Sequence, residues 1–289
     1  MQEKEMISFI QKAMPSIQIK DLESSNRGWD NHVFIVNHSF VFRFPKRKEV
    51  LEQIATEKRL LDMLQSTKPF LRVPSYQFHY QNGTAICTSH ELIDGKTLNQ
   101  IEPNMNIEKT AKLLGDFLSN LHQFPEEQAR RIGLTEKHGL SYWKNLYDSV
   151  KKSVYPHLSE NEIQEVSMIF ERFINHRLHK EIKKTVIHGD LTLANMIYND
   201  HVQTFTGIID FTDAQFSDPA FDFAGFYWDF GPEFTKKVLK YYSGHEDTDQ
   251  MFVRISQFYG LQPIFHEWLY MIEQNQPFNP EPGLAKLRK

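Results

Sequence analysis

Three polar residues near the middle of the 289-residue chain have the types and the order that phosphoryl transfer requires. Asp190 follows an H-G dipeptide, Asn195 lies five residues further along, and Asp210 ends the apolar run at 205–209. In phosphoryl transfer, one Asp accepts the proton of the attacking hydroxyl, while an Asn and a second Asp hold Mg²⁺. The order of these residues therefore predicts a phosphoryl-transfer site.

Short apolar runs next to these residues predict the strands that would position them. Residues 185–187 lead into the loop that carries Asp190, residues 196–198 leave it, and residues 205–209 lead to Asp210. Strand ends have a rigid backbone, which would fix the separations between the polar groups. Any one of these Asp or Asn residues alone would be read as a turn residue, so the prediction depends on their order.

The motif H-G-D-L-T-L-A-N, followed by I-I-D-F, resembles the aminoglycoside phosphotransferases and their relatives, the macrolide phosphotransferases. These are antibiotic kinases with a protein-kinase-like fold. The resemblance extends over 207–223, 230–242 and F-V-F-R-F-P-K-R at 40–47. It implies an α+β fold with two lobes. Residues 1–93 would form a small antiparallel-sheet lobe that binds nucleotide, and residues 94–289 a larger, mainly helical lobe for catalysis and acceptor binding.

The resemblance also implies roles for single residues. Asp190 would orient the acceptor hydroxyl and take its proton, while Asn195 and Asp210 would hold Mg²⁺ on the phosphates of ATP or GTP. The choice between the two nucleotides stays open. Arg43 stands where the family commonly has a phosphate-binding lysine; arginine keeps the charge but presents it as a planar fork. Glu57, on the helix that follows, is expected to pair with Arg43.

Two further segments are candidates for contacts with the nucleotide. The backbone N–H groups from Ser25 to Gly28 would cover the phosphates, although this loop has one glycine where protein kinases have three. Backbone groups of His90, Glu91 and Leu92 would meet the purine edge, an assignment that follows from position alone.

The nature of the acceptor is less constrained by the sequence. Four acidic residues lie where the family forms its acceptor cleft and would suit ammonium groups: Asp213, Asp229, Glu233 and Glu267. Asp218 and Asp222 are expected to brace the catalytic loop instead. Asn195 and the segments 207–223 and 230–242 favour an aminoglycoside kinase of the 2″ type. Arg43 and Thr212-Asp213-Ala214 favour a macrolide kinase. A phosphotransferase of either class would confer antibiotic resistance.

Other functions share the same catalytic residues. Metabolic small-molecule kinases, such as choline or methylthioribose kinases, carry similar motifs. A pseudokinase that binds nucleotide without turnover would explain Arg43 and the glycine-poor loop. A protein kinase is disfavoured, because no A-P-E motif follows Asp210.

The composition is that of an ordinary globular chain, with 40% hydrophobic and 24% charged residues. A net charge of −4 does not favour a nucleic-acid partner. The single cysteine, Cys87, excludes an internal disulfide and suits a reducing compartment. We find neither a signal peptide nor an apolar run of the ~18 residues that a membrane span needs. We therefore expect a cytoplasmic protein. We also expect it to be a monomer.

Hydrophobic periodicity and turn residues predict the supporting elements. They are a helix at 6–14, a hairpin of 32–36 with 40–44, a helix at 50–64, a hairpin of 76–80 with 84–88 around Asn82-Gly83, and a helix behind the capping box Ser159-x-x-Glu162.

Overall fold

The computed structural model describes residues 2–25, 30–98, 105–175 and 182–288. The chain divides into two compact units. Unit 1 contains Met1–Pro103 and Met196–Thr212, and unit 2 contains Asn104–Asn195 and Asp213–Lys289. The units follow packing rather than chain order, so the predicted lobe boundary between residues 93 and 94 stays a prediction.

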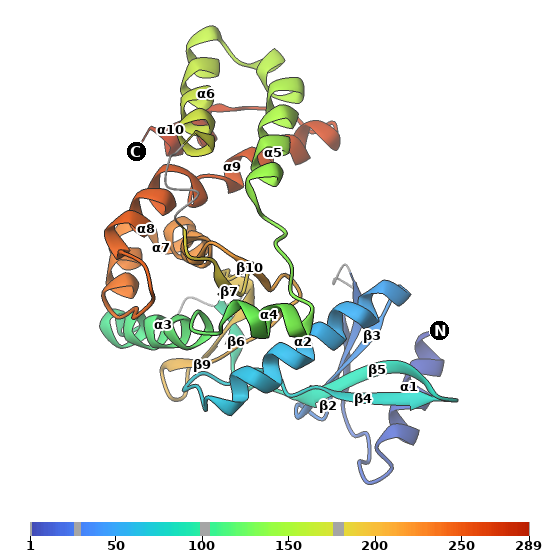
Figure 1. Cartoon of the computed structure of the whole chain (residues 1–289). Helices are drawn as coiled ribbons and strands as arrows, with labels where there is room; N and C mark the ends of the chain where they lie inside the picture. Colours follow the sequence, from blue (N-terminus) through green and yellow to red (C-terminus); the bar gives the residue numbers. More distant parts are fainter. Residues whose placement is uncertain (1, 26–29, 99–104, 176–181, 289) are drawn as a thin grey trace. The chain divides into compact units, whose positions relative to one another are not determined.

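Unit 1 is built on a five-stranded antiparallel sheet in the order β1-β2-β3-β5-β4 (Figure 1). Its strands are β1 (Leu22–Ser25), β2 (Asn31–Val36), β3 (Phe40–Pro45), β4 (Gln77–Gln81) and β5 (Thr84–Glu91). Both predicted hairpins are present, and the second turns at Asn82 and Gly83, with φ values of 51° and 78°. A two-residue hairpin turn of this type needs two left-handed residues, which is why Asn-Gly marks it in the sequence.

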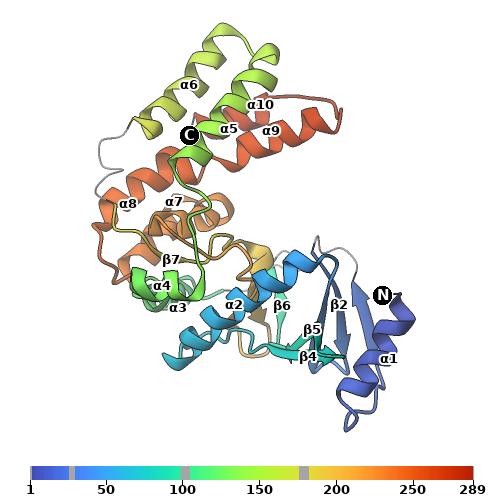
Figure 2. The ribbon, with the colours of Figure 1, turned by 45° about the vertical axis from the view of Figure 1, so that its right-hand side comes forward.

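Two helices, α1 (Glu3–Ala13) and α2 (Lys48–Ser66), lie on opposite faces of this sheet (Figure 2). Phe9 and Ile10 of α1 pack with Phe42 and Phe44 of β3, and the rings of Phe9 and Phe44 lie 6.1 Å apart. Successive side chains of a strand point to opposite faces. The alternation that turns Phe42 and Phe44 toward α1 therefore turns Arg43 toward α2.

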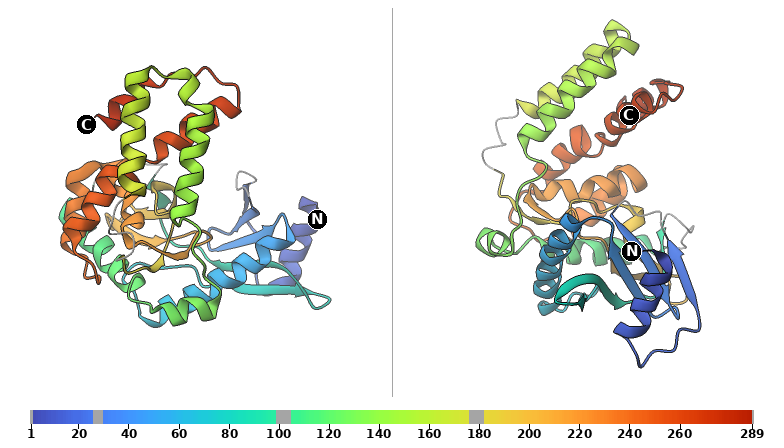
Figure 3. Two further views of the ribbon diagram at one scale, coloured as in Figure 1. Left: turned by 45° about the horizontal axis from the view of Figure 1, so that its top comes forward. Right: turned by 90° about the vertical axis from the view of Figure 1, so that its right-hand side faces the viewer.

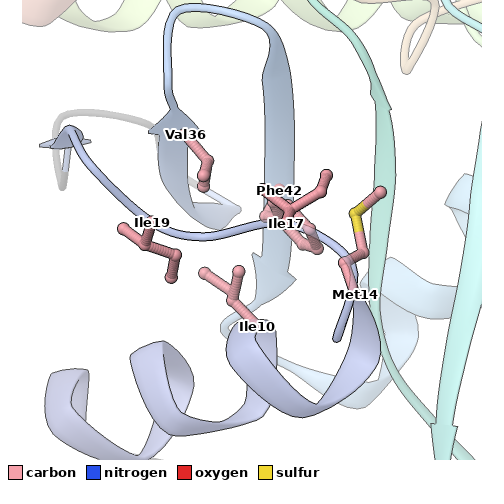
Figure 4. Close-up of a pocket in the computed structure, with 6 residues that line it drawn as sticks. All are labelled: Ile10, Met14, Ile17, Ile19, Val36 and Phe42. Carbon is pink, nitrogen blue, oxygen red and sulfur yellow. The ribbon is translucent and has the colours of Figure 1, made fainter.

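The side chains that lie between α1 and the sheet are apolar (Figure 4). They are Ile10, Met14, Ile17, Ile19, Val36 and Phe42. The space between these side chains is too small for a water molecule. This contact is therefore packing that stabilises the sheet rather than a ligand site.

A second, three-stranded sheet of unit 1 leads to Asp210. Its order is β6-β8-β9, with β6 (Lys96–Thr97), β8 (Met196–Asn199) and β9 (Thr204–Ile208). The segment between α2 and β4 is hydrogen-bonded to β9, because Arg72 N–H donates to Thr206 O at 2.9 Å and Ile208 N–H donates to Arg72 O at 2.9 Å. These bonds fix the strand that ends just before Asp210.

Unit 2 is mainly helical, and α5 and α6 lie side by side in it (Figure 3). Its long helices are α3 (Ile107–Leu121), α5 (Leu140–Ser153), α6 (Glu160–Ile174), α7 (Ala224–Lys240) and α9 (Pro263–Glu273). The shorter elements are α4 (Glu126–Ile132), η2 (Tyr155–His157), η4 (Leu193–Asn195), η5 (Pro219–Phe223), α8 (Thr248–Arg254), η6 (Ile255–Tyr259) and α10 (Glu281–Leu287). The predicted capping box opens α6, where Ser159 N–H donates to Glu162 Oε2 at 2.7 Å.

Two short strands, β7 (Thr185–Ile187) and β10 (Gln215–Ser217), pair antiparallel in unit 2. The core between α5, α6 and η6 is aromatic: Phe173 and Phe258 stack with ring centroids 3.8 Å apart, and Trp143 packs edge-on against Phe258 at 5.2 Å. Within the described ranges, no helix is both long enough and apolar enough to span a bilayer.

Candidate active site

In unit 1, a buried ion pair joins Arg43 of β3 to Glu57 of α2, as predicted. The nitrogen Nη1 of Arg43 lies 3.4 Å from both carboxylate oxygens of Glu57. The side chains are 11% and 1% exposed. Burial opposes the charge on Arg43, but Tyr76, Glu57 and Asp210 raise its pKa above the ordinary value, so the guanidinium stays charged.

Asp210 lies beside this ion pair, two residues after the end of β9. Its φ of 62° is left-handed, a conformation that Asp adopts more readily than most residues. Its carboxylate oxygen Oδ1 lies 3.8 Å from Nη2 of Arg43 and accepts a hydrogen bond from the hydroxyl of Thr212 at 2.6 Å. The side chain is 49% exposed. Unit 1 therefore brings three of the predicted residues together around an accessible carboxylate.

In unit 2, Asp190 and Asn195 belong to one tight loop that follows β7 and ends with η4. The side-chain amide of Asn195 donates to Asp190 Oδ2 at 2.9 Å and to the Asp190 carbonyl at 2.8 Å. The Asp190 N–H donates to Nδ1 of His188 at 3.2 Å, so this histidine supports the loop. Asp190 is exposed, whereas Asn195 and His188 are buried. The loop thus presents one oriented carboxylate on a buried support.

The support beneath this loop is the buried carboxylate of Asp222. The backbone N–H groups of His188 and Gly189 each donate to it at 2.8 Å, and Nε2 of His122 donates at 3.0 Å. Nδ1 of His122 lies 2.9 Å from the Tyr242 hydroxyl. Although burial opposes its charge, the hydrogen bond and charge of His122 hold the pKa of Asp222 below its ordinary value. Asp222 braces the loop, as predicted.

Gly189 allows the loop to approach the segment that follows Thr212. Its φ is 82°, and a Cβ at this position would lie 2.3 Å from the carbonyl oxygen of Asp213. Only glycine fits both conditions. The residue before Asp190 is thereby locked in place.

The predicted nucleotide contacts are only partly described. Ser25 ends β1 and pairs with Val33, while Gly28 lies outside the described residues. His90 and Glu91 end β5, and Leu92 N–H donates to the carbonyl of a residue in the β2–β3 turn at 2.7 Å. Burial lowers the pKa of His90 to about 4, so its ring is neutral. A cavity of about 310 Å³ borders His90 and Glu91.

The four acidic residues suggested for the acceptor differ in their surroundings. Asp229 accepts the Leu193 N–H at 3.4 Å, and burial raises its pKa. Asp213 pairs with Lys137 at 3.3 Å. Glu233 pairs with the neighbouring Lys236 at 3.1 Å, and Glu267 is exposed. Among the four, Asp229 is the one hydrogen-bonded to the loop that carries Asp190 and Asn195.

Sequence reasoning misses two residues of these networks. Tyr76 contacts both Arg43 and Glu57, and Thr212 holds Asp210. The sequence pattern predicts only a strand residue at Tyr76 and assigns no contact to Thr212. No periodicity or motif identifies their contacts with Arg43, because Arg43 lies 33 residues from Tyr76 and 169 residues from Thr212 in the sequence.

Comparison with known proteins relates this geometry to one family. The family model of the "Phosphotransferase enzyme family" matches residues 21–252. The uncharacterized protein YcbJ of Bacillus subtilis (strain 168) is 23% identical over 241 residues, which cover 78% of this chain and 75% of YcbJ. The GDP complex of wild-type aminoglycoside 2'-phosphotransferase-IIIa is 25% identical with a TM-score of 0.83, covering 100% of this chain and 98% of that one.

A macrolide enzyme shares the fold. Macrolide 2'-phosphotransferase type I superposes with a TM-score of 0.70 at 20% identity, covering 100% of this chain and 97% of that one. The predicted α+β, protein-kinase-like fold and the resemblance to the aminoglycoside and macrolide phosphotransferases are thus confirmed. The chain belongs to the phosphotransferase enzyme family, and it is a phosphotransferase of the type that uses a hydroxyl group as acceptor.

Proposed function

We propose that this protein transfers the terminal phosphoryl group of ATP or GTP to a hydroxyl of an antibiotic, with an aminoglycoside favoured over a macrolide. The observation that carries the proposal is the Asp190 carboxylate, exposed on a braced loop and oriented by Asn195 at 2.9 Å. A carboxylate held in this way can accept the hydrogen bond of an incoming hydroxyl and take its proton late in the transfer.

Arg43 and Glu57 are proposed to serve the donor. Glu57 would keep the guanidinium in place, and Arg43 would offset the negative charge of the phosphates. Because the guanidinium remains charged despite its burial, it can do so over the whole physiological pH range.

Asn195 and Asp210 are the residues proposed to hold Mg²⁺. Carboxylate and amide oxygens are ligands that Mg²⁺ accepts. The nitrogen Nδ2 of Asn195 donates to Asp190, so its oxygen Oδ1 is the atom suited to a cation. Half of the Asp210 side chain is exposed. When bound, Mg²⁺ neutralises charge on the phosphates.

An aminoglycoside acceptor is supported by charge and by similarity. Asp229 and Glu233 flank a kink in α7 at Gly231, and carboxylates there would pair with ammonium groups. The relative bound to GDP and kanamycin, APH(2")-IIIa, is 26% identical with a TM-score of 0.82 and covers 99% of this chain and 98% of that chain, whereas the macrolide enzyme is more distant. A cell that carries such an activity would resist the antibiotic.

The test is a phosphorylation screen of the purified protein with product mass as the readout. ATP and GTP are supplied in parallel with Mg²⁺, against kanamycin-type aminoglycosides, macrolides and choline. We expect a mass gain of one phosphate on an aminoglycoside, and its loss when EDTA removes Mg²⁺. Phosphorylation of choline alone would instead identify a metabolic kinase.

Variants at Asp190 test the assignment of the proton acceptor. Asp190→Asn should lower kcat by roughly 10²- to 10⁴-fold, the usual contribution of a positioned base, while nucleotide affinity stays near that of the wild type. Asp200→Asn, at an exposed position after β8, is the matched control and should keep full activity. Normal turnover of Asp190→Asn would remove this residue from the mechanism. Nucleotide binding without transfer to any acceptor would favour a pseudokinase.

A further inference from the structure

We propose that Tyr76 is a positioning residue that allows an arginine, rather than a lysine, to bind the donor phosphates. This inference rests on the proposed function of Arg43. Tyr76 lies just before β4, in a segment where the sequence shows no catalytic motif, and it is 3% exposed.

The Tyr76 hydroxyl is hydrogen-bonded to both members of the ion pair. It donates to Glu57 Oε1 at 2.8 Å and accepts a hydrogen bond from Nη1 of Arg43. The direct distances from Nη1 to the two Glu57 oxygens are both 3.4 Å, longer than the 2.7–3.2 Å of a good N–H···O bond. The hydroxyl therefore bridges two charged groups whose direct contacts are long.

This link requires a phenol that keeps its proton. A tyrosine hydroxyl has one hydrogen, which Tyr76 donates to Glu57, and lone pairs that accept from Arg43. Burial, followed by the charge of Glu57, raises the pKa of Tyr76 well above its ordinary value, so the proton stays. Glu57 Oε1 also accepts the Phe211 N–H at 3.0 Å, which fixes the carboxylate from the opposite end of the network.

The consequence concerns the second nitrogen of the guanidinium. With Nη1 held by Tyr76, Nη2 faces Thr212 Oγ1 at 3.5 Å and Asp210 Oδ1 at 3.8 Å. A lysine has a single nitrogen that must serve both its carboxylate partner and the phosphate. Arginine can divide these tasks between two nitrogens, provided that a third group fixes its orientation.

The surroundings hold Tyr76 itself in place. The ring packs edge-on against His90, with centroids 5.4 Å apart, and Cζ of Arg43 lies 5.4 Å from its centroid. Four residues earlier, Arg72 is hydrogen-bonded to β9, the strand that leads to Asp210. Tyr76 and Asp210 are thus fixed to the same framework within unit 1.

The test removes the hydroxyl and keeps the ring. Tyr76→Phe should raise the KM for the Mg²⁺–nucleotide or lower kcat so that kcat/KM falls roughly ten- to a hundredfold, as expected for a hydrogen bond to a charged partner. The matched control is Tyr80→Phe on β4, where the side chain is 63% exposed. It should change neither constant, and both variants should keep the melting temperature within a few degrees.

A second background separates positioning from structure. In an Arg43→Lys protein, the amine can bind Glu57 directly, so adding Tyr76→Phe should lower kcat/KM by no more than about threefold. An equal loss in both backgrounds, or a Tyr76→Phe enzyme with wild-type constants, would overturn the proposal.

Failure of the proposed function gives a different result. If the wild type phosphorylates no acceptor, titration calorimetry with ATP or GTP and Mg²⁺ still measures the role of Tyr76. Weaker nucleotide binding by Tyr76→Phe than by Tyr80→Phe would then support the inference, and equal binding would refute it.

Discussion

Replacing Asp222 with asparagine should both destabilise unit 2 and misplace the catalytic loop. The carboxylate accepts three hydrogen bonds, from the N–H groups of His188 and Gly189 and from Nε2 of His122. An asparagine has one oxygen and one NH₂ group. In either orientation of the amide, its NH₂ group faces a backbone N–H of the loop, because His188 and Gly189 donate to different carboxylate oxygens.

The magnitude follows from counting these bonds. One buried N–H group without an acceptor costs about 1–3 kcal/mol. Each of the two remaining hydrogen bonds becomes weaker by about 1 kcal/mol, because its acceptor is no longer charged. The free energy of unfolding should therefore fall by roughly 3–5 kcal/mol. For a chain of this size, that corresponds to a drop in Tm of roughly 5–15 °C.

The assay is thermal unfolding followed by circular dichroism, with kcat measured in parallel. The matched control is Asp116→Asn on α3, where the carboxylate is 32% exposed and pairs with Lys112 at 2.7 Å. A surface pair of this kind contributes about 1 kcal/mol or less. If the melting temperatures of the two variants agree within about 1 °C, the reasoning on the buried carboxylate is refuted.

The same prediction has a pH dependence of defined sign. The folded-state pKa of Asp222 lies below its ordinary value of 3.8. A depressed carboxylate pKa contributes stability that is present above the unfolded pKa and is lost as the pH falls through the folded pKa. The wild type should lose this contribution below about pH 4. The stability advantage of the wild type over Asp222→Asn should therefore shrink there.

Two further predictions use other buried positions. Gly189→Ala should lower the free energy of unfolding by more than about 2 kcal/mol and kcat at least tenfold, because it combines a φ of 82° with a Cβ 2.3 Å from a carbonyl oxygen. The control, Gly83→Ala, has a φ of 78° but lies in open space, so it should lower the free energy of unfolding by about 1 kcal/mol. Denaturant unfolding and kcat measurements compare the two variants. Cys87 is buried, and burial raises the pKa of its thiol to about 12. Iodoacetamide at pH 8 should therefore label it only after the protein unfolds. Labelling of the folded protein would contradict this prediction.

Much of the fold was predictable because its signals are local. The Asn82-Gly83 turn, the Ser159-Glu162 capping box and the apolar face of α1 each act within a few residues. The catalytic loop is also local, since Asp190 and Asn195 are joined within one turn. Interactions between residues that are close in the sequence can be predicted from the order of the residue types.

The supporting contacts were harder to predict because they join distant parts of the chain. His122 and Asp222 are separated by 100 residues, and Arg43 and Thr212 by 169. Periodicity indicates that such positions are buried, yet it does not identify the partner. The pairing of Arg43 with Glu57 was predicted because a family resemblance supplied the distant partner.

Burial distinguishes the roles of aspartates that the sequence alone does not separate, both before and after β9. Asp218 is buried and its charge is matched by Arg254 at 2.8 Å, and Asp222 is matched by three donors. The hydrogen bonds of these buried carboxylates are already made within the protein, so they stabilise the structure and do not bind a ligand. Asp210 has an exposed carboxylate on a left-handed residue, and Asp190 has one on a braced loop. Asp222 fixes the backbone next to Asp190. Under the proposed function, this would let Asp190 accept a proton without reorganisation, which is the property that electrostatic catalysis requires.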